Sequence, residues 1–359
     1  MKKVLFIGGS LNQTTIVHSI AKHLEQDYDC YFTPFYADGI LQFMNEAGLL
    51  DFTIMGGNFR QQTESYLLEK NLKIDYAGRN NDYDLVVMAI DLIVPKNIRG
   101  KKVVLIQEGM TDPENLIYQL VKTFKLPRYL ASTATVGLSD AYDKFCVASQ
   151  GYRDLFIRKG INPQKLVVTG IPNFDNAAQY LKNDFPHKNY ILVATSDTRE
   201  TFKFDNRKRF ILKALEIANG KSIIFKLHPN EKVDRATREI HEIVPHAMVY
   251  VDGNINHMIA NCDILITQYS SVVYIGLALG KEVYSYFDIE VLKRLTPLQN
   301  GGTSSKNIAQ ICRDLLENEI EENVKRKFYF GNGRNTSKGV ELPEDSDCNS
   351  GKNSFFQAS

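Results

Sequence analysis

The sequence predicts an α/β protein built from two doubly wound, Rossmann-like domains that face each other across a cleft. Short apolar segments alternate with amphipathic stretches along the chain, which is the pattern of βαβ units in an open parallel sheet. This pattern restarts after the polar, proline-containing segment at residues 183–189. With 359 residues, the chain is also long for a single hydrophobic core.

The strand candidates are short runs, several of them apolar on both faces, as in parallel strands that helices cover on each side. In the first half of the chain they are residues 3–7, 30–34, 85–90, 103–107, 135–138 and 145–148. In the second half they are residues 166–169, 190–195, 222–227, 248–251, 264–267 and 283–287. Helices are expected over residues 12–25, 59–70, 206–218, 271–279 and 307–318.

The division into domains follows from where this pattern restarts and where it ends. We place the first domain at residues 1–184 and the second at residues 185–330. From Gly331 onward Gly, Asn, Ser, Lys and Asp dominate, and no apolar period remains. We therefore expect residues 331–359 to form a disordered tail.

Composition and charge exclude several classes of protein. There are 43 Lys and Arg residues and 42 Asp and Glu residues, so the formal net charge is +1, and no overall field points to a nucleic-acid partner. The basic group at residues 207–209 begins a predicted helix without interleaved aromatic residues, which is typical of a solvated face. No run reaches the roughly 20 apolar residues of a membrane-spanning helix, and the apolar run at residues 4–7 is too short for a signal-peptide core.

The five cysteines are scattered and form neither a C-x-x-C pair nor a zinc-binding pattern. Such a set is typical of reduced thiols in a cytoplasmic protein. We therefore expect a cytoplasmic protein, which can also work at the inner face of the membrane without spanning it.

Ligands of open parallel sheets bind beyond the carboxyl ends of the strands, so the residues directly after strands are the first candidates for a site. Gly8-Gly9-Ser10 follows the first strand, where small residues permit a tight turn and a close approach to a ligand. The alternative is a tight turn alone. The spacing is not that of a dinucleotide-binding fingerprint, so no such cofactor is expected.

Two acidic side chains follow strands in the two halves of the chain. Glu108, in Gln107-Glu108-Gly109, stands where a carboxylate can face a cleft and transfer a proton, or lie in an exposed loop. Asp197 follows the first strand of the second domain and precedes Arg199. It is a nucleophile, a base, or only a cap for the following turn.

The second domain offers two further strand ends. The strand at residues 222–227 leads into His228-Pro229-Asn230, and the proline restricts the backbone that carries the imidazole. An imidazole held there can donate a hydrogen bond to a phosphate. A buried strand leads into Tyr269-Ser270-Ser271 at the start of a predicted helix, where hydroxyls and free amides can bind an anion. Serine capping alone would explain one of the two serines.

The sequence Asp82-Tyr83-Asp84 spells the D-x-D motif that many metal-dependent sugar transferases use. It precedes its strand and so belongs to the opposite edge of the sheet. We interpret it as structural.

Together these turns resemble the two-domain glycosyltransferases of the GT-B fold. Over residues 190–316, the His-Pro and Ser-Ser motifs are similar to those of CDP-glycerol glycerophosphotransferases and capsule-polysaccharide transferases, which usually carry an aspartate where this chain has Gln268. Bacterial sialyltransferases and Kdo transferases combine a Gln-Glu-Gly or acidic-acidic-Gly motif with His-Pro and Ser-Ser in this order. Gln107-Glu108-Gly109 and the turn at residues 196–199 are most similar to the retaining β-Kdo transferases of capsule, lipopolysaccharide and O-antigen synthesis.

The resemblance implies a role for each motif. Asp197 would be the nucleophile that forms a glycosyl-enzyme, and Glu108 would be the acid/base for the acceptor hydroxyl. His228 would contact the departing cytidine monophosphate, and Ser270 with Ser271 would bind its phosphate. The implied donor-binding residues are Gln107, Gly109, His228, Pro229, Asn230, Tyr269, Ser270 and Ser271, and those lining the cleft are Gly8, Gly9, Ser10 and Arg199.

The resemblance also implies the partners. The donor would be a CMP-activated sugar bound by the second domain, and the first domain would bind a glycan or glycolipid acceptor. Neither a metal nor a cofactor is expected.

Three alternatives remain at this stage. An inverting sialyltransferase or a CDP-glycerol glycerophosphotransferase would use Glu108 or His228 as the base and leave Asp197 structural. The turn at residues 168–173 resembles one in UDP-N-acetylglucosamine 2-epimerases, but the glycine-rich pair of that family is absent where Ser270-Ser271 stands. A binding module would hold the nucleotide without turnover. The acceptor and the oligomeric state stay open.

Overall fold

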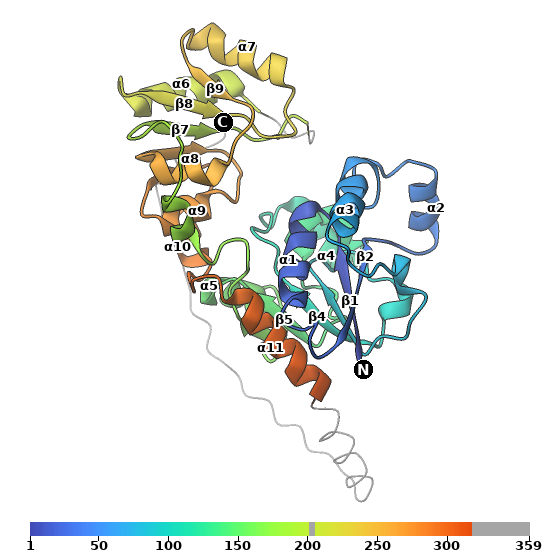
Figure 1. The fold of residues 1–359 in the computed structure, drawn as a ribbon. Coiled ribbons are helices and arrows are strands. Elements are labelled where there is room, and N and C mark those ends of the chain that lie inside the picture. The colour runs from blue at the N-terminus through green and yellow to red at the C-terminus, as the bar shows by residue number, and fades with distance from the viewer. Residues whose placement is uncertain (201–204, 318–359) are drawn as a thin grey trace, which may run out of the picture.

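The structure is a computed structural model that describes residues 1–200 and 205–317. It contains two separate parallel sheets flanked by helices (Figure 1), so the predicted fold class is confirmed. The tail expected at residues 331–359 lies outside the described residues, as does residue 318 of the last expected helix.

The first sheet has six strands in the order β2-β1-β3-β4-β5-β6, and every pairing in it is parallel. Its strands are β1 (Lys3–Gly8), β2 (Asp29–Pro34), β3 (Leu85–Met88), β4 (Lys102–Ile106), β5 (Lys144–Val147) and β6 (Leu166–Val168). The helices around it are α1 (Leu11–Ala21), α2 (Ile40–Glu46), α3 (Gly57–Glu69), α4 (Leu116–Phe124) and α5 (Gln150–Arg158), with the shorter turns η1 (Tyr76–Gly78), η2 (Lys96–Ile98) and η3 (Arg128–Thr135).

The second sheet has five strands in the order β11-β10-β7-β8-β9, again with only parallel pairings. Its strands are β7 (Ile191–Ala194), β8 (Ile223–Lys226), β9 (Met248–Tyr250), β10 (Ile264–Thr267) and β11 (Glu282–Tyr284). The remaining helices are η4 (Ala177–Leu181), α6 (Arg207–Ala218), α7 (Val233–Ile243), α8 (Ile255–Asn261), α9 (Val273–Ala278), α10 (Ile289–Leu295) and α11 (Ser304–Glu317).

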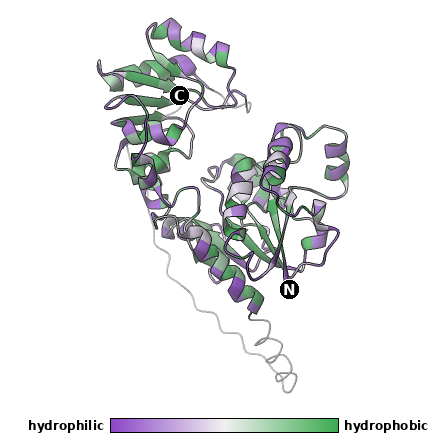
Figure 2. Cartoon of the chain, in the orientation of Figure 1, coloured by the Kyte–Doolittle hydropathy of each residue, from purple (hydrophilic) through white to green (hydrophobic). Residues whose placement is uncertain are grey.

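The central strands form because their residues are apolar on both faces. All four residues of β3, of β7 and of β10 are buried, and helices cover both sides of each sheet, as parallel sheets require. Figure 2 shows this arrangement, with hydrophobic strands inside and helices that alternate between hydrophobic and hydrophilic residues. The carboxyl ends of the strands in each sheet therefore become the places where polar loop residues can gather.

One predicted strand, residues 135–138, is wrong. This segment continues η3 as a series of turns. Gly137 has φ = +85°, outside the extended region, and the amides of Gly137 and Ser139 donate to the carboxylate of Asp91 at 2.9 and 3.1 Å. The backbone hydrogen bonds that a strand would give to a neighbour are thus used by a buried side chain.

The chain crosses between the two domains twice, and the two crossings lie side by side. Asn300 in the second crossing donates to the carbonyl of Thr169 at 3.1 Å, and the amide of Gly301 donates to the carbonyl of Asp175 at 3.0 Å. After the second crossing, α11 returns to pack on α1 (Figure 1). The domain boundary placed at residue 184 stays a prediction, because η4 before it contacts α8 and α9 of the second domain.

A buried pair of tyrosines joins the domains. The hydroxyls of Tyr152 in α5 and Tyr274 in α9 are 2.7 Å apart, and burial raises the pKa of Tyr152 to about 12 and that of Tyr274 still further. Both side chains are at most 1% exposed. The contact therefore lies in a continuous apolar region shared by both domains.

Removing the two hydroxyls one at a time should give unequal effects. We expect Tyr152→Phe to lower the free energy of unfolding by about 1–3 kcal/mol, because the buried hydroxyl of Tyr274 loses the one partner it has among the described residues. Tyr274→Phe should cost less, since the hydroxyl of Tyr152 keeps its interactions with the side chain of Gln107 and the backbone of Thr111. Urea unfolding of both variants and of the double variant checks this. Equal costs for the two single changes would contradict it.

Candidate functional site

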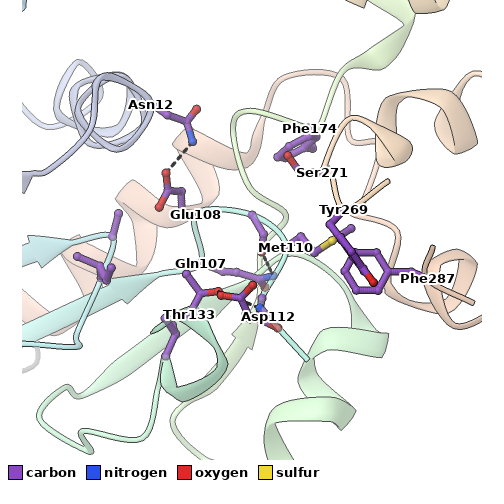
Figure 3. A pocket seen from close by; sticks show the side chains of 15 residues that line it. Asn12, Gln107, Glu108, Met110, Asp112, Thr133, Phe174, Tyr269, Ser271 and Phe287 are labelled. Carbon is purple, nitrogen blue, oxygen red and sulfur yellow. Dashed lines mark hydrogen bonds between the residues drawn. The ribbon is translucent and has the colours of Figure 1, made fainter. Parts of the chain in front are cut away.

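A cavity of about 430 Å³ lies between the two domains at the carboxyl ends of β4 and β10 (Figure 3). The first domain contributes Asn12, Gln107, Glu108, Gly109, Met110 and Asp112 to its wall, and the second contributes Tyr269, Ser271 and Phe287. Phe174, in the first crossing between the domains, completes the wall. A ligand in this cavity would touch both domains.

Glu108 is fixed in this wall by side chains that follow β1. Its carboxylate accepts hydrogen bonds from Ser10 Oγ at 3.3 Å, Asn12 Nδ2 at 3.0 Å and Gln13 Nε2 at 2.6 Å. All three donors are neutral, and Glu108 remains partly exposed to the cavity. The carboxylate is therefore held in one orientation by neutral groups, an arrangement suited to accepting a proton from a ligand hydroxyl.

The small residues after β1 serve α1. A Cβ on Gly8 would collide with Thr14, and one on Gly9 would collide with Gln13, so both glycines let the helix pack close to the strand end. Ser10 caps α1 by accepting from the amide of Gln13 at 3.2 Å. This is the tight turn expected as the alternative to a ligand site, and its effect is to bring Asn12 and Gln13 to Glu108.

Gln107 is only 1% exposed and braces the loop that carries Glu108. Its Nε2 donates to the carbonyl of Gly109 at 2.7 Å, and its Oε1 accepts from the amide of Ala148 at 2.9 Å. The polar atoms of Gln107 are thus engaged within the protein. Gly109 lines the cavity beside Phe174, where an added Cβ would lie 3.6 Å from the ring.

Asp91 holds the opposite wall in place. It is 1% exposed, and burial raises the pKa of its carboxyl group although the amides of Gly137 and Ser139 donate to it. Its backbone carbonyl also accepts from Arg128 at 2.8 Å. These contacts set the path of η3, which brings Thr133 to the cavity.

Asp197, His228 and Asn230 lie together at the neighbouring ends of β7 and β8. Nδ1 of His228 is 3.7 Å from Oδ2 of Asp197 and accepts a hydrogen bond from the amide of Asn230 at 3.2 Å. Asn230 Nδ2 in turn donates to Oδ2 of Asp197 at 2.9 Å. Because Nδ1 accepts, we assign the proton of a neutral imidazole to Nε2, where it can be donated to a ligand.

A buried ionic network supports the loops that follow β7 and β8. Glu231 accepts from the guanidinium of Arg207 at 2.7 Å and from the amide of His228 at 2.9 Å, and its carboxylate also contacts the hydroxyl of Thr195. Arg207 pairs with Asp205 at 3.0 Å. The expectation of a solvated basic face at residues 207–209 is wrong for Arg207, which is 4% exposed, and fits Lys208 and Arg209, which are exposed.

Gln268 belongs to the same network and uses both atoms of its side-chain amide. Its Oε1 accepts from Ser196 Oγ at 2.8 Å, and its Nε2 donates to Asp205 at 2.7 Å. An aspartate at this position would place a second carboxylate against Asp205. The amide instead links the loops after β7 and β10.

The segment at residues 269–271 differs from its prediction. The helix α9 begins at Val273, two residues later than expected, and has six residues. No side chain caps it in the usual way, and the amide of Val272 reaches Ser270 Oγ only at 3.5 Å. Free amides at a helix start, on which the predicted phosphate site depended, are therefore a weaker feature here than the sequence indicated.

Tyr269 and Ser271 nevertheless reach the interdomain cavity. Tyr269 is 47% exposed, and its ring centroid lies 5.1 Å from those of both Tyr286 and Phe287. This aromatic group offers a flat apolar surface of the kind on which a nucleotide base stacks.

The structure thus divides the predicted site residues into two groups. Gln107, Glu108, Gly109, Tyr269 and Ser271 line the cavity, whereas Asp197, His228, Pro229, Asn230 and Ser270 do not. Arg199 makes a two-pronged ion pair with Glu239 of α7, with both distances 2.8 Å. The motif at residues 82–84 precedes β3, and the carboxylate of Asp84 accepts from the amide of Lys3 at 2.7 Å.

Several residues that line the cavity or support its wall were not predicted from the sequence. Asn12 and Gln13 had a usable signal, since polar residues in the first turn of a helix after a strand point toward the same edge as the strand end. Phe174 and Phe287 had none, because they come together only when the domains dock. Residues 110–112 also line this cavity, whereas residues 56, 57 and 60 line a separate one.

The structure describes residues 1–200 and 205–317. In this part of the chain, no three His, Cys, Asp or Glu side chains gather as they would around a metal ion. None of the helices there is long and apolar enough to cross a bilayer.

Comparison with known proteins yields structural likeness only. No family model and no curated protein matches the chain. Among solved structures, it is similar to the UDP-GlcNAc 2-epimerase of Neisseria meningitidis bound to UDP-GlcNAc, with 13% identity over 88% of this chain and 100% of that one, and a TM-score of 0.53. A putative UDP-N-acetylglucosamine 2-epimerase of Listeria monocytogenes gives 14% identity, 90% coverage of both chains and a TM-score of 0.50. The wall teichoic acid polymerase TagF gives 12% identity, 89% coverage of both chains and a TM-score of 0.46. At such identities the likeness shows the fold alone, and that fold is of the GT-B type.

Proposed function

We propose that this protein is a glycosyltransferase that moves Kdo, or a related ulosonic acid, from its CMP-activated form to a surface-glycan or glycolipid acceptor. The observation that carries the proposal is the setting of Glu108. Its carboxylate is oriented by three neutral donors in the wall of an interdomain cavity. Across this cavity lie the aromatic side chain of Tyr269 and the hydroxyl of Ser271.

The proposed reaction has two displacements. The carboxylate of Asp197 attacks the anomeric carbon of the donor, the bond to the phosphate oxygen breaks, and cytidine monophosphate leaves with its charge met by the Nε2 proton of His228. The acceptor hydroxyl then gives its proton to Glu108 and attacks the same carbon, which frees the Asp197 carboxylate. Because Asp197 does not line the present cavity, this scheme requires the second domain to close further on the first when the donor binds.

Intact-protein mass spectrometry tests the glycosyl-enzyme. Glu108→Gln incubated with CMP-Kdo should gain the mass of one Kdo residue, because the first displacement proceeds while the base for the second is missing. The matched control is Asp197→Ala in the Glu108→Gln background, which should gain nothing. Product formation by Asp197→Ala at the wild-type rate would overturn the double displacement.

One observation favours a second candidate, an inverting transferase. Glu108 lines the cavity, whereas Asp197 lies outside its lining and accepts a hydrogen bond from Asn230. Glu108 alone can therefore act as the base in a single displacement. The product would then have the opposite anomeric configuration, which NMR reads directly. A donor panel of CMP-Kdo, CMP-sialic acid, CDP-glycerol and UDP-GlcNAc separates the sialyltransferase, glycerophosphotransferase and epimerase alternatives.

A further inference from the structure

The helix α4 is apolar on two faces, of which one is buried. Tyr118 and Val121 pack against Ala131 and Ala134 in a small separate core. The opposite face exposes 42–75% of each of four large apolar side chains, namely Leu116, Ile117, Leu120 and Phe124. A soluble surface helix ordinarily carries polar residues there, so this face calls for a partner.

The exposed apolar surface continues beyond the helix. Leu126, Tyr129 and Leu130 are 42–52% exposed, and with the four side chains of α4 they form what we call the α4 patch. Between Glu114 and Asp140 the chain has no acidic residue, and its charged residues are Lys122, Lys125 and Arg128. Arg128 turns inward to the carbonyl of Asp91. Lys122 and Lys125 are exposed, and Nζ of Lys122 also donates to the carbonyl of Lys159 at 3.2 Å. The patch therefore combines apolar side chains with positive charge.

A second exposed apolar segment in the same domain provides a contrast. Ile40, Phe43, Leu49 and Phe52 are 59–79% exposed around α2, which lies at the outer edge of the domain in Figure 1. This segment carries Asp38, Glu46 and Asp51 and no basic residue between positions 38 and 52. An anionic surface would repel it and would attract the α4 patch.

We propose that the α4 patch docks the protein on an anionic lipid bilayer. Leu116, Ile117, Leu120 and Phe124 would enter the boundary between headgroups and acyl chains, as the apolar faces of interfacial helices do. Lys122 and Lys125, near the end of the helix, would stay at the level of the anionic headgroups. The occupant is thus a membrane surface. A second copy of the chain is less suitable, because residues 115–139 carry basic but no acidic side chains and two such patches would repel each other.

The chain segments on either side of α4 reach the interdomain cavity. Met110 and Asp112, just before α4, line the cavity, and so does Thr133 in η3. Asp112 and Thr133 are joined by two hydrogen bonds of 2.8 Å, which tie the base of the patch to the cavity wall (Figure 3). Docking would bring the cavity close to the bilayer, so that the acceptor is a lipid-anchored glycan. This last step rests on the proposed function.

Vesicle flotation with the full chain tests the docking. We expect the protein to float with vesicles of phosphatidylglycerol and phosphatidylcholine and to float much less with phosphatidylcholine alone. Ile117→Ser with Phe124→Ser should abolish flotation. Lys122→Gln and Lys125→Gln should each weaken the apparent partition coefficient about fivefold. The matched control, Phe43→Ser with Phe52→Ser, should float like the wild type.

Two results would overturn the docking proposal. One is equal flotation of the wild type and the Ile117→Ser, Phe124→Ser variant. The other is a dimer in light scattering that this variant dissociates, which would assign the patch to a second copy of the chain. Hydrolysis of CMP-Kdo without vesicles separates this proposal from the enzymatic one. The patch variants should still hydrolyse CMP-Kdo. A wild-type protein that floats but hydrolyses no donor would support the docking surface and contradict the proposed activity.

Discussion

Replacing Glu108 with glutamine should lower the rate of transfer by about 10²- to 10⁴-fold, the usual contribution of a positioned general base. Glutamine has nearly the same shape, and its Oε1 can still accept from Ser10 and Asn12, which now both donate to Oε1 of Glu108. Its amide group would face Nε2 of Gln13, so one hydrogen bond of about 1 kcal/mol is lost. The expected result is a folded protein with a strongly reduced steady-state rate of cytidine monophosphate release in the presence of acceptor.

The specificity of this effect is checked with a nearby carboxylate. Glu114 is exposed and does not line the interdomain cavity, so Glu114→Gln should transfer at close to the wild-type rate. Thermal unfolding of both variants shows whether a lost rate reflects lost structure. If Glu108→Gln keeps more than a tenth of the wild-type rate, Glu108 is not the base.

The fold was predictable because each strand carries its own signal. Runs such as residues 103–106 are apolar on both faces, so local sequence alone indicates a covered parallel strand. The same rule failed at residues 135–138, where an apolar residue on either side of Gly137 imitates a strand. The deciding contact there is the carboxylate of Asp91, more than 40 residues away in the chain, and no local pattern contains it.

The site was predictable only as far as strand order allows. The loops after β7 and β8 had to meet because those strands are neighbours, and Asp197 and His228 do lie 3.7 Å apart. Whether these two side chains or Tyr269 and Ser271 reach the cavity depends on the angle between the domains, which no local sequence feature sets. Arg207 shows a second limit, since its burial depends on Asp205 and Glu231 together.

Removing the carboxylate of Glu231 should be among the most destabilising single changes in the second domain. Its side chain is fully buried and that of Arg207 is 4% exposed. Glu231→Ala would leave the guanidinium with Asp205 and the carbonyl of Ser196 and the amide of His228 without its charged acceptor. Breaking a buried pair in this way costs about 3–5 kcal/mol of the free energy of unfolding, which urea unfolding followed by circular dichroism would measure.

A paired substitution shows whether the lost stability comes from an unpaired buried charge or from lost packing. Arg207→Met with Glu231→Leu removes both charges and keeps most of the volume. It should cost less than Glu231→Ala alone, because the buried carboxylate of Asp205 keeps Arg199 at 3.4 Å. The exposed pair of Lys293 and Glu290 is the control, and Glu290→Ala should change the unfolding curve little. If Glu231→Ala unfolds at the wild-type urea concentration, the network does not hold the loop of His228. Donor hydrolysis by the paired variant tests the position of His228 separately, because a stable protein in which His228 is displaced should no longer hydrolyse the donor.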